Sequence, residues 1–223
     1  MIPIGDDDSA RRITPVVTYV LIALNVLVFF LELNNGEAFI QRWAFVPTRF
    51  LADPVGDFVT LFTSMFMHAG WLHLLGNMLY LWIFGDNVED RFGHGLFLGF
   101  YILCGLGATF AQLAFNMASS IPNLGASGAI AGVLGAYIVM FPGGRVNVLL
   151  GRVVTRMSAL IVIGFWILIQ IFSQISVFTA SSQTEGGGVA YMAHIGGFVA
   201  GVVLTFLLGG TRRALPPPRA YRY

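Results

Sequence analysis

The chain has 223 residues, of which 57% are hydrophobic and only 10% are charged, with a formal net charge of +1 at pH 7. Because a soluble domain has roughly 45–50% apolar and about 25% charged residues, this composition excludes an ordinary soluble protein and predicts an integral membrane protein. The net charge gives no indication of a nucleic-acid partner, and the one cysteine, Cys104, is expected to pack inside a span rather than to react.

Uncharged apolar runs long enough to cross about 30 Å of hydrocarbon as a helix indicate where the chain spans a bilayer. Five clear runs cover residues 15–33, 61–85, 95–117, 157–178 and 188–210, and a shorter run covers residues 127–141. Strands of alternating polarity are absent from the pattern. We therefore predict an all-α membrane protein, a bundle of six transmembrane helices, rather than an outer-membrane barrel.

Arginine is the only basic residue type among the 12 Lys+Arg residues, and its distribution predicts the orientation of the bundle. Arg42 and Arg49 alone fall in the first loop. The others fall at the two termini and in the second and fourth loops: Arg11, Arg12, Arg91, Arg145, Arg152, Arg156, Arg212, Arg213, Arg219 and Arg222. By the positive-inside rule both termini are cytoplasmic. The first run is too long for a secretory signal and no small-residue cleavage site follows it, so we predict a retained helix.

The chain leaves room for a single membrane domain, predicted for residues 14–210, between two short cytoplasmic tails at residues 1–13 and 211–223. Both tails are polar and are expected to be disordered. The longest loop, residues 34–60, lies outside in this topology and carries five aromatic side chains: Phe39, Trp43, Phe45, Phe50 and Phe58. We expect this loop to rest among the outer headgroups, and the alternative is a solvent-exposed loop with its own small core.

Polar side chains inside the spans are costly in a bilayer and are therefore candidates for function. The strong candidates are three histidines, an asparagine and a serine: His68, His73, Asn77, Ser127 and His194. The weaker candidates are Asn25, Gln112, Asn116, Gln170, Ser173 and Gln174. For the weaker group, ordinary hydrogen bonding between helices is the better interpretation.

Three of the strong candidates share one predicted depth in the membrane. Each lies 18 residues before the first firm cytoplasmic arginine of its span, in the pairs His73 and Arg91, Ser127 and Arg145, and His194 and Arg212. At about 1.5 Å per helical residue this is about 27 Å, so all three are expected in one layer near the outer side.

Small residues predict that the helices of Ser127 and His194 approach closely. Two G-x-x-x-G pairs carry this prediction: Gly128 with Gly132, and Gly197 with Gly201. Ordinary helix packing explains these glycines equally well, and the shared depth favours a functional contact. A serine beside a neutral histidine is a nucleophile beside its general base.

The oxyanion that such a nucleophile creates needs hydrogen-bond donors. Ser127 begins its span with unpaired backbone N–H groups, and His73 with Asn77, at i and i+4, can present two more donors from one helix face. Three small residues let a substrate backbone and a partner helix approach the hydroxyl: Gly125, Ala126 and Gly128. His68 projects about 140° away from His73 and is expected to be structural.

Three segments together resemble the rhomboid family of intramembrane serine proteases: MHAGWLHLLGN, GASG at residues 125–128 and AHIGGFVAG at residues 193–201. The resemblance covers all six predicted spans. It implies a Ser127–His194 dyad without a third acidic member, and an oxyanion hole made by His73, Asn77 and the Ser127 backbone N–H. It also implies membrane-anchored substrates, usually single-span proteins, cut near the outer face with small residues favoured at the cleaved bond. The segment GDNVEDRFG, with Glu89 and Arg91, resembles the family's cytoplasmic turn and is expected to be structural.

Two positions depart from the family pattern. Many relatives carry an aromatic residue four positions after the nucleophile, against which the base histidine stacks, whereas this chain has Ala131. Tyr137 is expected to lie too deep to replace it, so the sequence leaves open what orients His194. Relatives also often carry Trp-Arg in the outer loop, where this chain has Val59 and Thr60.

Three functions compete, and an active serine endopeptidase is the preferred one. A silent relative that only binds transmembrane segments would usually lack the serine or the histidine. A haem or metal site made by His68, His73 and His194 is disfavoured, because histidines five apart on a helix do not share a face. No cofactor or metal is expected. We expect a prokaryotic cell (inner) membrane with the site opening to the outer side, while the oligomeric state and the physiological substrate stay open.

Overall fold

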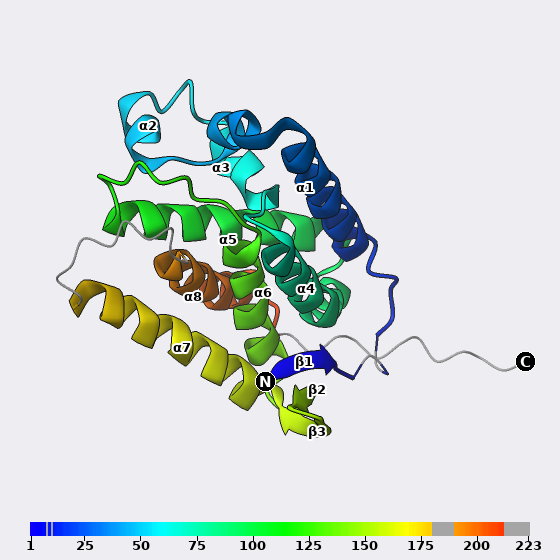
Figure 1. Cartoon of the computed structure of the whole chain (residues 1–223). Helices are drawn as coiled ribbons and strands as arrows, with labels where there is room; N and C mark the ends of the chain where they lie inside the picture. The colour runs from blue at the N-terminus through cyan, green and yellow to red at the C-terminus, as the bar shows by residue number, and fades with distance from the viewer. Residues whose placement is uncertain (8, 10, 180–189, 212–223) are drawn as a thin grey trace, which may run out of the picture.

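The structure is a computed structural model that describes residues 1–7, 9, 11–179 and 190–211, most of them helical (Figure 1). The long helices are α1 (Val16–Trp43), α4 (Trp71–Phe92), α5 (His94–Phe115), α6 (Ser127–Met140), α7 (Ala159–Thr179) and α8 (Tyr191–Leu207). The short elements are β1 (Ile2–Gly5), α2 (Pro47–Ala52), α3 (Thr60–Thr63), the 3-10 helix η1 (Ser64–Phe66), β2 (Arg145–Leu150) and β3 (Val153–Ser158).

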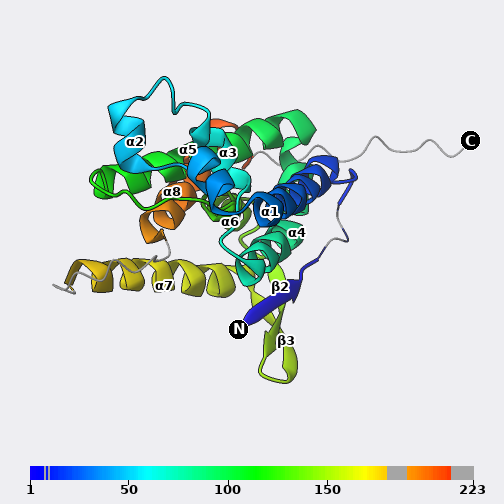
Figure 2. The ribbon, with the colours of Figure 1, turned by 45° about the horizontal axis from the view of Figure 1, so that its top comes forward.

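Helix α6 lies at the centre of the bundle and packs against α4, α5, α7 and α8 (Figure 1). Its residues 128–137 are all buried, as expected for a helix that is apolar around its whole circumference. Helix α7 stands at the edge of the bundle and packs mainly against α8 (Figure 2). Ser127 therefore begins the most enclosed helix of the bundle. Helix α7, which packs against α6 and α8, is far less enclosed.

Glycines make the contact between α6 and α8. A Cβ atom placed on Gly197 would collide with the carbonyl oxygen of Gly128, and one placed on Gly201 would collide with that of Gly132. The two backbones can touch only while these positions lack side chains. This contact brings the first turns of α6 and α8 side by side.

The second apolar run forms a break and a helix rather than one continuous span. The prediction of a span from residue 61 is wrong at its start, because the chain becomes extended at Met67 and α4 begins only at Trp71. Both carboxyl oxygens of Glu32 on α1 accept the backbone N–H of His68 in this break, each at 3.1 Å. A hydrogen bond to a side chain of another helix thus replaces the helical one.

Helix α1 extends beyond its predicted end at residue 33. It continues to Trp43, with a break at Gly36, whose φ of 64° lies in the left-handed region. The first part of the predicted loop at residues 34–60 is therefore helical, and only the remainder connects α1 to α3.

Arg49 organises this connection. Its guanidinium donates to Asp57 Oδ1 at 2.7 Å, to the carbonyl oxygen of Ala44 at 2.5 Å and to that of Gln41. One side chain thus joins the end of α1 to the segment after α2.

The same loop has the small core that the sequence offered as one alternative. Phe45 is buried with Leu61 and Leu113 in a small apolar cluster of its own. Val55 and Phe58, at the tip of the loop, are 88% and 57% exposed. The loop therefore has a core on its inner side and an apolar outer surface.

Three short strands are the main departure from the predicted all-α fold. They form an antiparallel sheet in the order β1-β2-β3, at the end of the bundle where α6 finishes (Figure 1). α6 stops at Met140, just before Pro142, and the chain turns into β2. Val146 and Val148 of β2 are fully buried, so the sheet shares the core of the bundle. The expectation of a disordered tail at residues 1–13 is wrong for β1.

Polar contacts join the N-terminal segment to the same end of the bundle. The Asp6 carboxylate accepts the Tyr137 hydroxyl of α6 at 2.7 Å and the Asn87 side-chain amide of α4 at 2.8 Å. Arg11 forms an ion pair with Asp86 at 2.5 Å. The segment therefore bridges α4 and α6, which lie far apart in the sequence.

Glu89 connects the starts of two other helices to α4. Its carboxylate is fully buried and accepts the backbone N–H groups of Val17 and Thr18 at 2.9 and 2.7 Å, which occupies donors that the first turn of α1 leaves free. It also contacts the His94 ring at the start of α5 at 2.6 Å. The structural role expected for this turn fits these contacts.

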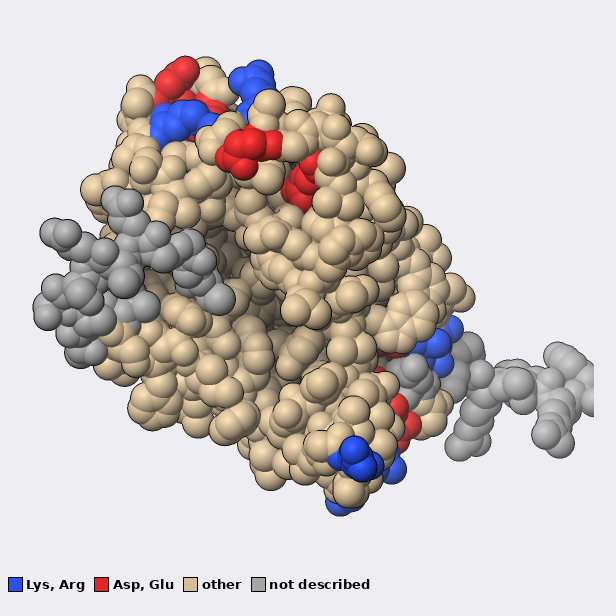
Figure 3. All heavy atoms as spheres, in the orientation of Figure 1, with Lys and Arg blue, Asp and Glu red and all other residues tan. Residues whose placement is uncertain are grey.

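The described helices are those of an integral membrane protein. Three of them are long and apolar enough to cross a bilayer, namely α1, α5 and α7, and α6 and α8 are shorter apolar helices. Charged side chains gather at two opposite ends of the face in Figure 3, with a band between them that carries none. The depth estimate from arginines does not hold for Ser127, because α6 ends before Arg145. Arg212 and the predicted tail after residue 211 lie outside the described residues.

Candidate active site

Ser127 is the first residue of α6 and is presented by a short loop. Gly125 has a φ of 135°, in the left-handed region, and its N–H donates to the carbonyl oxygen of Ser64 at 2.9 Å. Ala126, which follows it, is fully buried. The loop therefore fixes the start of α6, where backbone N–H groups are free of helical partners.

His194 comes from the first turn of α8 and meets Ser127 directly. Its Nε2 lies 2.7 Å from the Ser127 Oγ, within hydrogen-bonding distance. The imidazole is 8% exposed, so it is largely shielded from solvent. Neutral imidazole at this distance can accept the hydroxyl proton, which is the arrangement of a nucleophile and its base.

The other side of the His194 ring is covered by α7. The Gln170 side-chain oxygen lies 2.8 Å from His194 Nδ1, and the Trp166 ring lies at 5.5 Å between centroids, tilted by 39°. Ala131 is buried within α6, and the hydroxyl of Tyr137 is bonded to Asp6 at the far end of the helix. From the sequence alone, Gln170 is interpreted as a helix-packing residue. The one available signal of another role is its i, i+4 spacing from Trp166, which puts both on one helix face.

His73 lies close to Ser127 on the opposite side, on the first turn of α4. A Cβ atom built on Gly125 would lie 3.1 Å from His73 Nε2 and 3.4 Å from Ser127 Oγ, so both groups border the glycine. His73 Nδ1 accepts the backbone N–H of Ala69 at 3.3 Å. Its proton therefore resides on Nε2, which can donate a hydrogen bond beside the serine.

Asn77 lies one helical turn further along α4 and lines the same cavity as Ser127. Its side chain is 8% exposed, and its amide nitrogen has no hydrogen-bond acceptor among the described residues. Buried polar groups are normally paired, so an amide without an acceptor is available to a ligand.

His68 does not reach Ser127 but supports the groups that do. It is 2% exposed, and its ring packs edge-on against the His73 ring at 5.1 Å. The remaining predicted residues, Gly197 and Gly201, make the contact of α8 with α6. The described residues include no group of three or more His, Cys, Asp or Glu side chains that could hold a metal ion.

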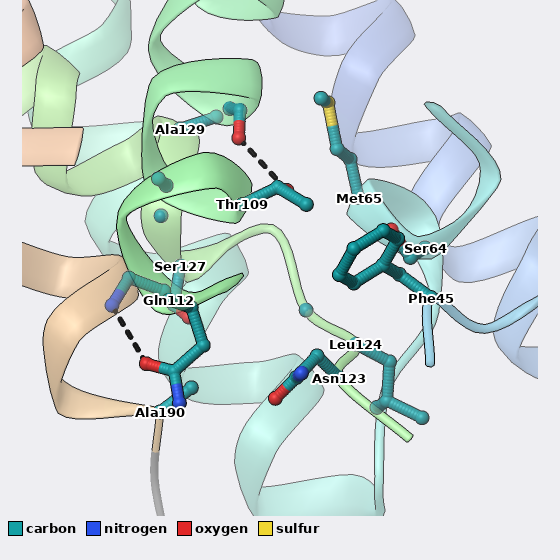
Figure 4. A pocket seen from close by; sticks show the side chains of 15 residues that line it. Phe45, Ser64, Met65, Thr109, Gln112, Asn123, Leu124, Ser127, Ala129 and Ala190 are labelled. Carbon is teal, nitrogen blue, oxygen red and sulfur yellow. Dashed lines mark hydrogen bonds between the residues drawn. The ribbon is translucent and has the colours of Figure 1, made fainter. Parts of the chain in front are cut away.

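Two cavities meet at Ser127. The larger has a volume of about 660 Å³ and lies between α4 and α7, with Ser127 and His194 at its wall. The face in Figure 3 is hollowed between the regions of these two helices. The smaller cavity, of about 40 Å³, lies on the side of α5 and is lined by polar groups of Ser64 and Gln112 (Figure 4). Gln112 also accepts the backbone N–H of Ala193 at 3.1 Å, as expected of a residue that joins two helices.

A family model described as the Rhomboid domain matches residues 55–211 of the chain. The matched range includes Ser127, His194, His73 and Asn77.

Two bacterial proteins and a mitochondrial one are similar to the chain. Rhomboid protease GluP of Bacillus subtilis (strain 168) is 33% identical over 87% of this chain and 35% of its own length. Rhomboid protein 1, mitochondrial, of Saccharomyces cerevisiae is 28% identical over 83% of this chain and 51% of its own length. The putative rhomboid protease YdcA of B. subtilis is 29% identical over 88% and 89%. The chain thus spans about a third of GluP, half of the yeast protein and most of YdcA.

Proposed function

The chain belongs to the rhomboid family, and from this premise we propose that it is an intramembrane serine endopeptidase. It hydrolyses peptide bonds in or near the transmembrane segments of membrane-anchored proteins. The observation that carries the proposal is the 2.7 Å distance between Ser127 Oγ and His194 Nε2, across two helices of a membrane protein.

The proposed reaction begins with proton transfer from the Ser127 hydroxyl to His194 Nε2 as Oγ attacks the substrate carbonyl carbon. The C–N bond then breaks, and His194 returns the proton to the leaving amine. Water attacks the resulting ester by the same route in reverse, with His194 again as the base, and releases the carboxylic acid product. The small cavity beside Ser127 has room for a few water molecules, at about 10–15 Å³ for each.

The negative oxygen of each tetrahedral intermediate is stabilised by three donors in this proposal. They are His73 Nε2–H, the Asn77 side-chain amide and the backbone N–H of Ser127. The hydrogen bond from Ala69 supports the His73 assignment, and the unused amide hydrogens support that of Asn77. A preorganised donor of this kind typically contributes about 10²–10³ in rate.

The substrate occupies the cavity between α4 and α7 as an extended, locally unwound segment, with small residues favoured at the cleaved bond. Single-span proteins suit this geometry, since one segment has to enter the cavity from the bilayer. We propose six spans, with both termini cytoplasmic and the cavity open to the outer side, in a prokaryotic cell (inner) membrane. The arginine distribution and the uncharged band in Figure 3 support this topology.

Fluorophosphonate labelling tests the proposal, because the reagent reacts only with an activated serine. The purified protein is expected to take up the label and to cleave a single-span substrate without added metal or nucleotide. Ser127→Ala and His194→Ala are expected to abolish both activities while thermal unfolding stays cooperative. Ser176→Ala, which removes an exposed α7 hydroxyl, is the matched control and keeps both. Labelling or cleavage by the Ser127→Ala protein would reject the mechanism.

A further inference from the structure

Two side chains of α7 cover the face of His194 that is turned away from Ser127. The Gln170 oxygen lies 2.8 Å from His194 Nδ1, and the Trp166 ring packs against the imidazole at 5.5 Å. The two residues are four positions apart, so both lie on the face of α7 that is turned to α8. Gln170 is itself 8% exposed, which keeps this contact away from bulk water.

The chemistry of this contact determines which nitrogen of His194 carries the proton. An amide oxygen can only accept a hydrogen bond, so Nδ1 has to be the protonated nitrogen. Nε2 is then left with a free lone pair directed at the Ser127 hydroxyl, as a general base requires. In the opposite tautomer Nε2 would carry a hydrogen and could not take the serine proton.

No other described group is placed to accept a hydrogen bond from His194 Nδ1. The cavity around Ser127 and His194 has no Asp or Glu among its described lining residues, and Ala131 offers no aromatic ring from α6. The titratable side chains that share the cavity with His194 are His73 and Tyr80 of α4 and Tyr191 of α8. Among the described residues, the acceptor that faces Nδ1 is the neutral amide oxygen of Gln170 on α7.

We propose that Gln170 is the positioning residue of the catalytic base, the third member of a Ser127–His194–Gln170 chain, with Trp166 holding the plane of the ring. The proposal rests on the proposed protease function. Gln170 acts through His194 and does not touch the substrate carbonyl. Because the amide is uncharged, it fixes the tautomer and the orientation of the ring without the charge that an acidic third member would add.

Three variants separate this role from simple packing. Gln170→Leu removes the acceptor at similar size and is expected to lower kcat about tenfold, the scale of one neutral hydrogen bond, with little change in KM. Gln170→Glu keeps an acceptor oxygen whether or not it is protonated and is expected to restore most of the loss. Gln174→Leu, one turn further along α7 and equally buried, is the matched control and is expected to behave as the wild type.

Histidine ¹⁵N NMR gives a readout that does not depend on proteolysis. The chain has four histidines, so the His194 ring signals can be assigned with single substitutions. We expect His194 protonated at Nδ1 in the wild type and in Gln174→Leu, and a mixture of tautomers in Gln170→Leu. A wild-type His194 protonated at Nε2, or a Gln170→Leu protein with unchanged kcat and tautomer, would overturn the inference. If the wild type neither labels nor cleaves, the proposed function fails, while the NMR result still decides on the contact.

Discussion

We infer that the two histidines beside Ser127 carry their protons on opposite nitrogens. The Nδ1 of His73 accepts a backbone N–H from Ala69, which leaves a donor at Nε2. The Nδ1 of His194 faces the Gln170 oxygen, which leaves an acceptor at Nε2. In the proposed mechanism one side-chain type thus supplies both an oxyanion donor and a base, and in each case the partner of the distant nitrogen decides which.

The proposed oxyanion donors can be distinguished from structural residues by single substitutions. Asn77→Ala is expected to lower kcat about 10²–10³-fold, because a donor to the transition state is lost. Its thermal unfolding temperature is expected to stay the same or to rise, since the amide nitrogen has no acceptor in the free protein and its burial is costly. Cleavage kinetics and a thermal melt on the same sample measure both effects.

Asn35→Ala provides the control for that prediction. Asn35 is exposed on α1 and its amide bonds only to the carbonyl oxygen of Leu31, so its loss is expected to leave kcat unchanged. A large fall in the melting temperature of Asn77→Ala would contradict the donor role and indicate a structural one.

At this scale the sequence predicts the groups that meet at the proposed site but not what orients them. Ser127, His194, His73 and Asn77 stand out because a polar side chain in a span is costly and their local motifs are distinctive. Gln170 does not, because glutamine in a span usually joins helices and the residue it meets lies 24 positions away. Nothing local to α7 predicts which helix it will face.

At the scale of elements, the glycine contact between α6 and α8 determines whether Ser127 and His194 meet. Gly201→Ala is expected to destabilise the protein by about 1–3 kcal/mol, because the new methyl group collides with the backbone of Gly132. Activity is expected to fall as well, since separating the helices lengthens the Ser127–His194 distance. Thermal unfolding and fluorophosphonate labelling measure the two effects.

Gly99→Ala is the matched substitution on α5. A Cβ atom there meets nothing within 4 Å, so the change is expected to be neutral or to stabilise by about 0.5–1 kcal/mol through helix propensity. Equal behaviour of the two alanine variants would show that the α6–α8 contact tolerates a side chain, against this interpretation.

Glu32 is expected to support the oxyanion hole through the break before α4. Glu32→Ala leaves the His68 N–H without an acceptor, which costs about 1–3 kcal/mol and loosens the turn that carries Ala69 and its bond to His73. Glu32→Gln keeps an acceptor oxygen and is expected to retain most of the activity. Melting temperatures and cleavage rates of the two variants test this.

Glu37→Ala is the control for Glu32, because in the described part of the chain its carboxylate contacts only Gln41, on the exposed surface of α1. In a His73→Ala background the additional effect of Glu32→Ala on kcat is expected to vanish. An undiminished effect there would mean that Glu32 acts by another route.

The elements that the sequence predicts wrongly share one feature. Each is determined by contacts with residues that are remote in the sequence. Hydropathy detects the apolar run at residues 61–70 but not its break, which Glu32 stabilises from α1. The three strands are short, and β1 pairs with β2 across more than half of the chain. Helix bounds inside the apolar runs follow from local sequence, whereas these breaks and strands depend on partners remote in the sequence.

Across the whole molecule, the sheet connects the N-terminal segment to α7, the helix whose Trp166 and Gln170 contact His194. β1 pairs with β2, β2 pairs with β3, and β3 leads directly into α7, whose first N–H, at Ala159, bonds to the carbonyl oxygen of Gly144 at 2.9 Å. Apart from the sheet, α7 packs mainly against α8. The sheet therefore supports the first turn of α7, and Trp166 and Gln170, which contact His194, lie further along the same helix.

Deleting residues 2–5, which form β1, is expected to loosen this support while leaving Ser127 and its neighbours unchanged. Backbone amides of β2 lose their β1 partners, so hydrogen exchange is expected to become faster at residues 145–158 and in the first turns of α7. The melting temperature is expected to fall by about 2–4 °C for each kcal/mol lost. Cleavage is expected to weaken far less than in Ser127→Ala, because α7 still packs on α8. Arg152→Ala, at the exposed hairpin turn, removes no strand pairing and should change none of these readouts. Unchanged exchange at residues 145–158 after the deletion would show that the sheet does not depend on β1.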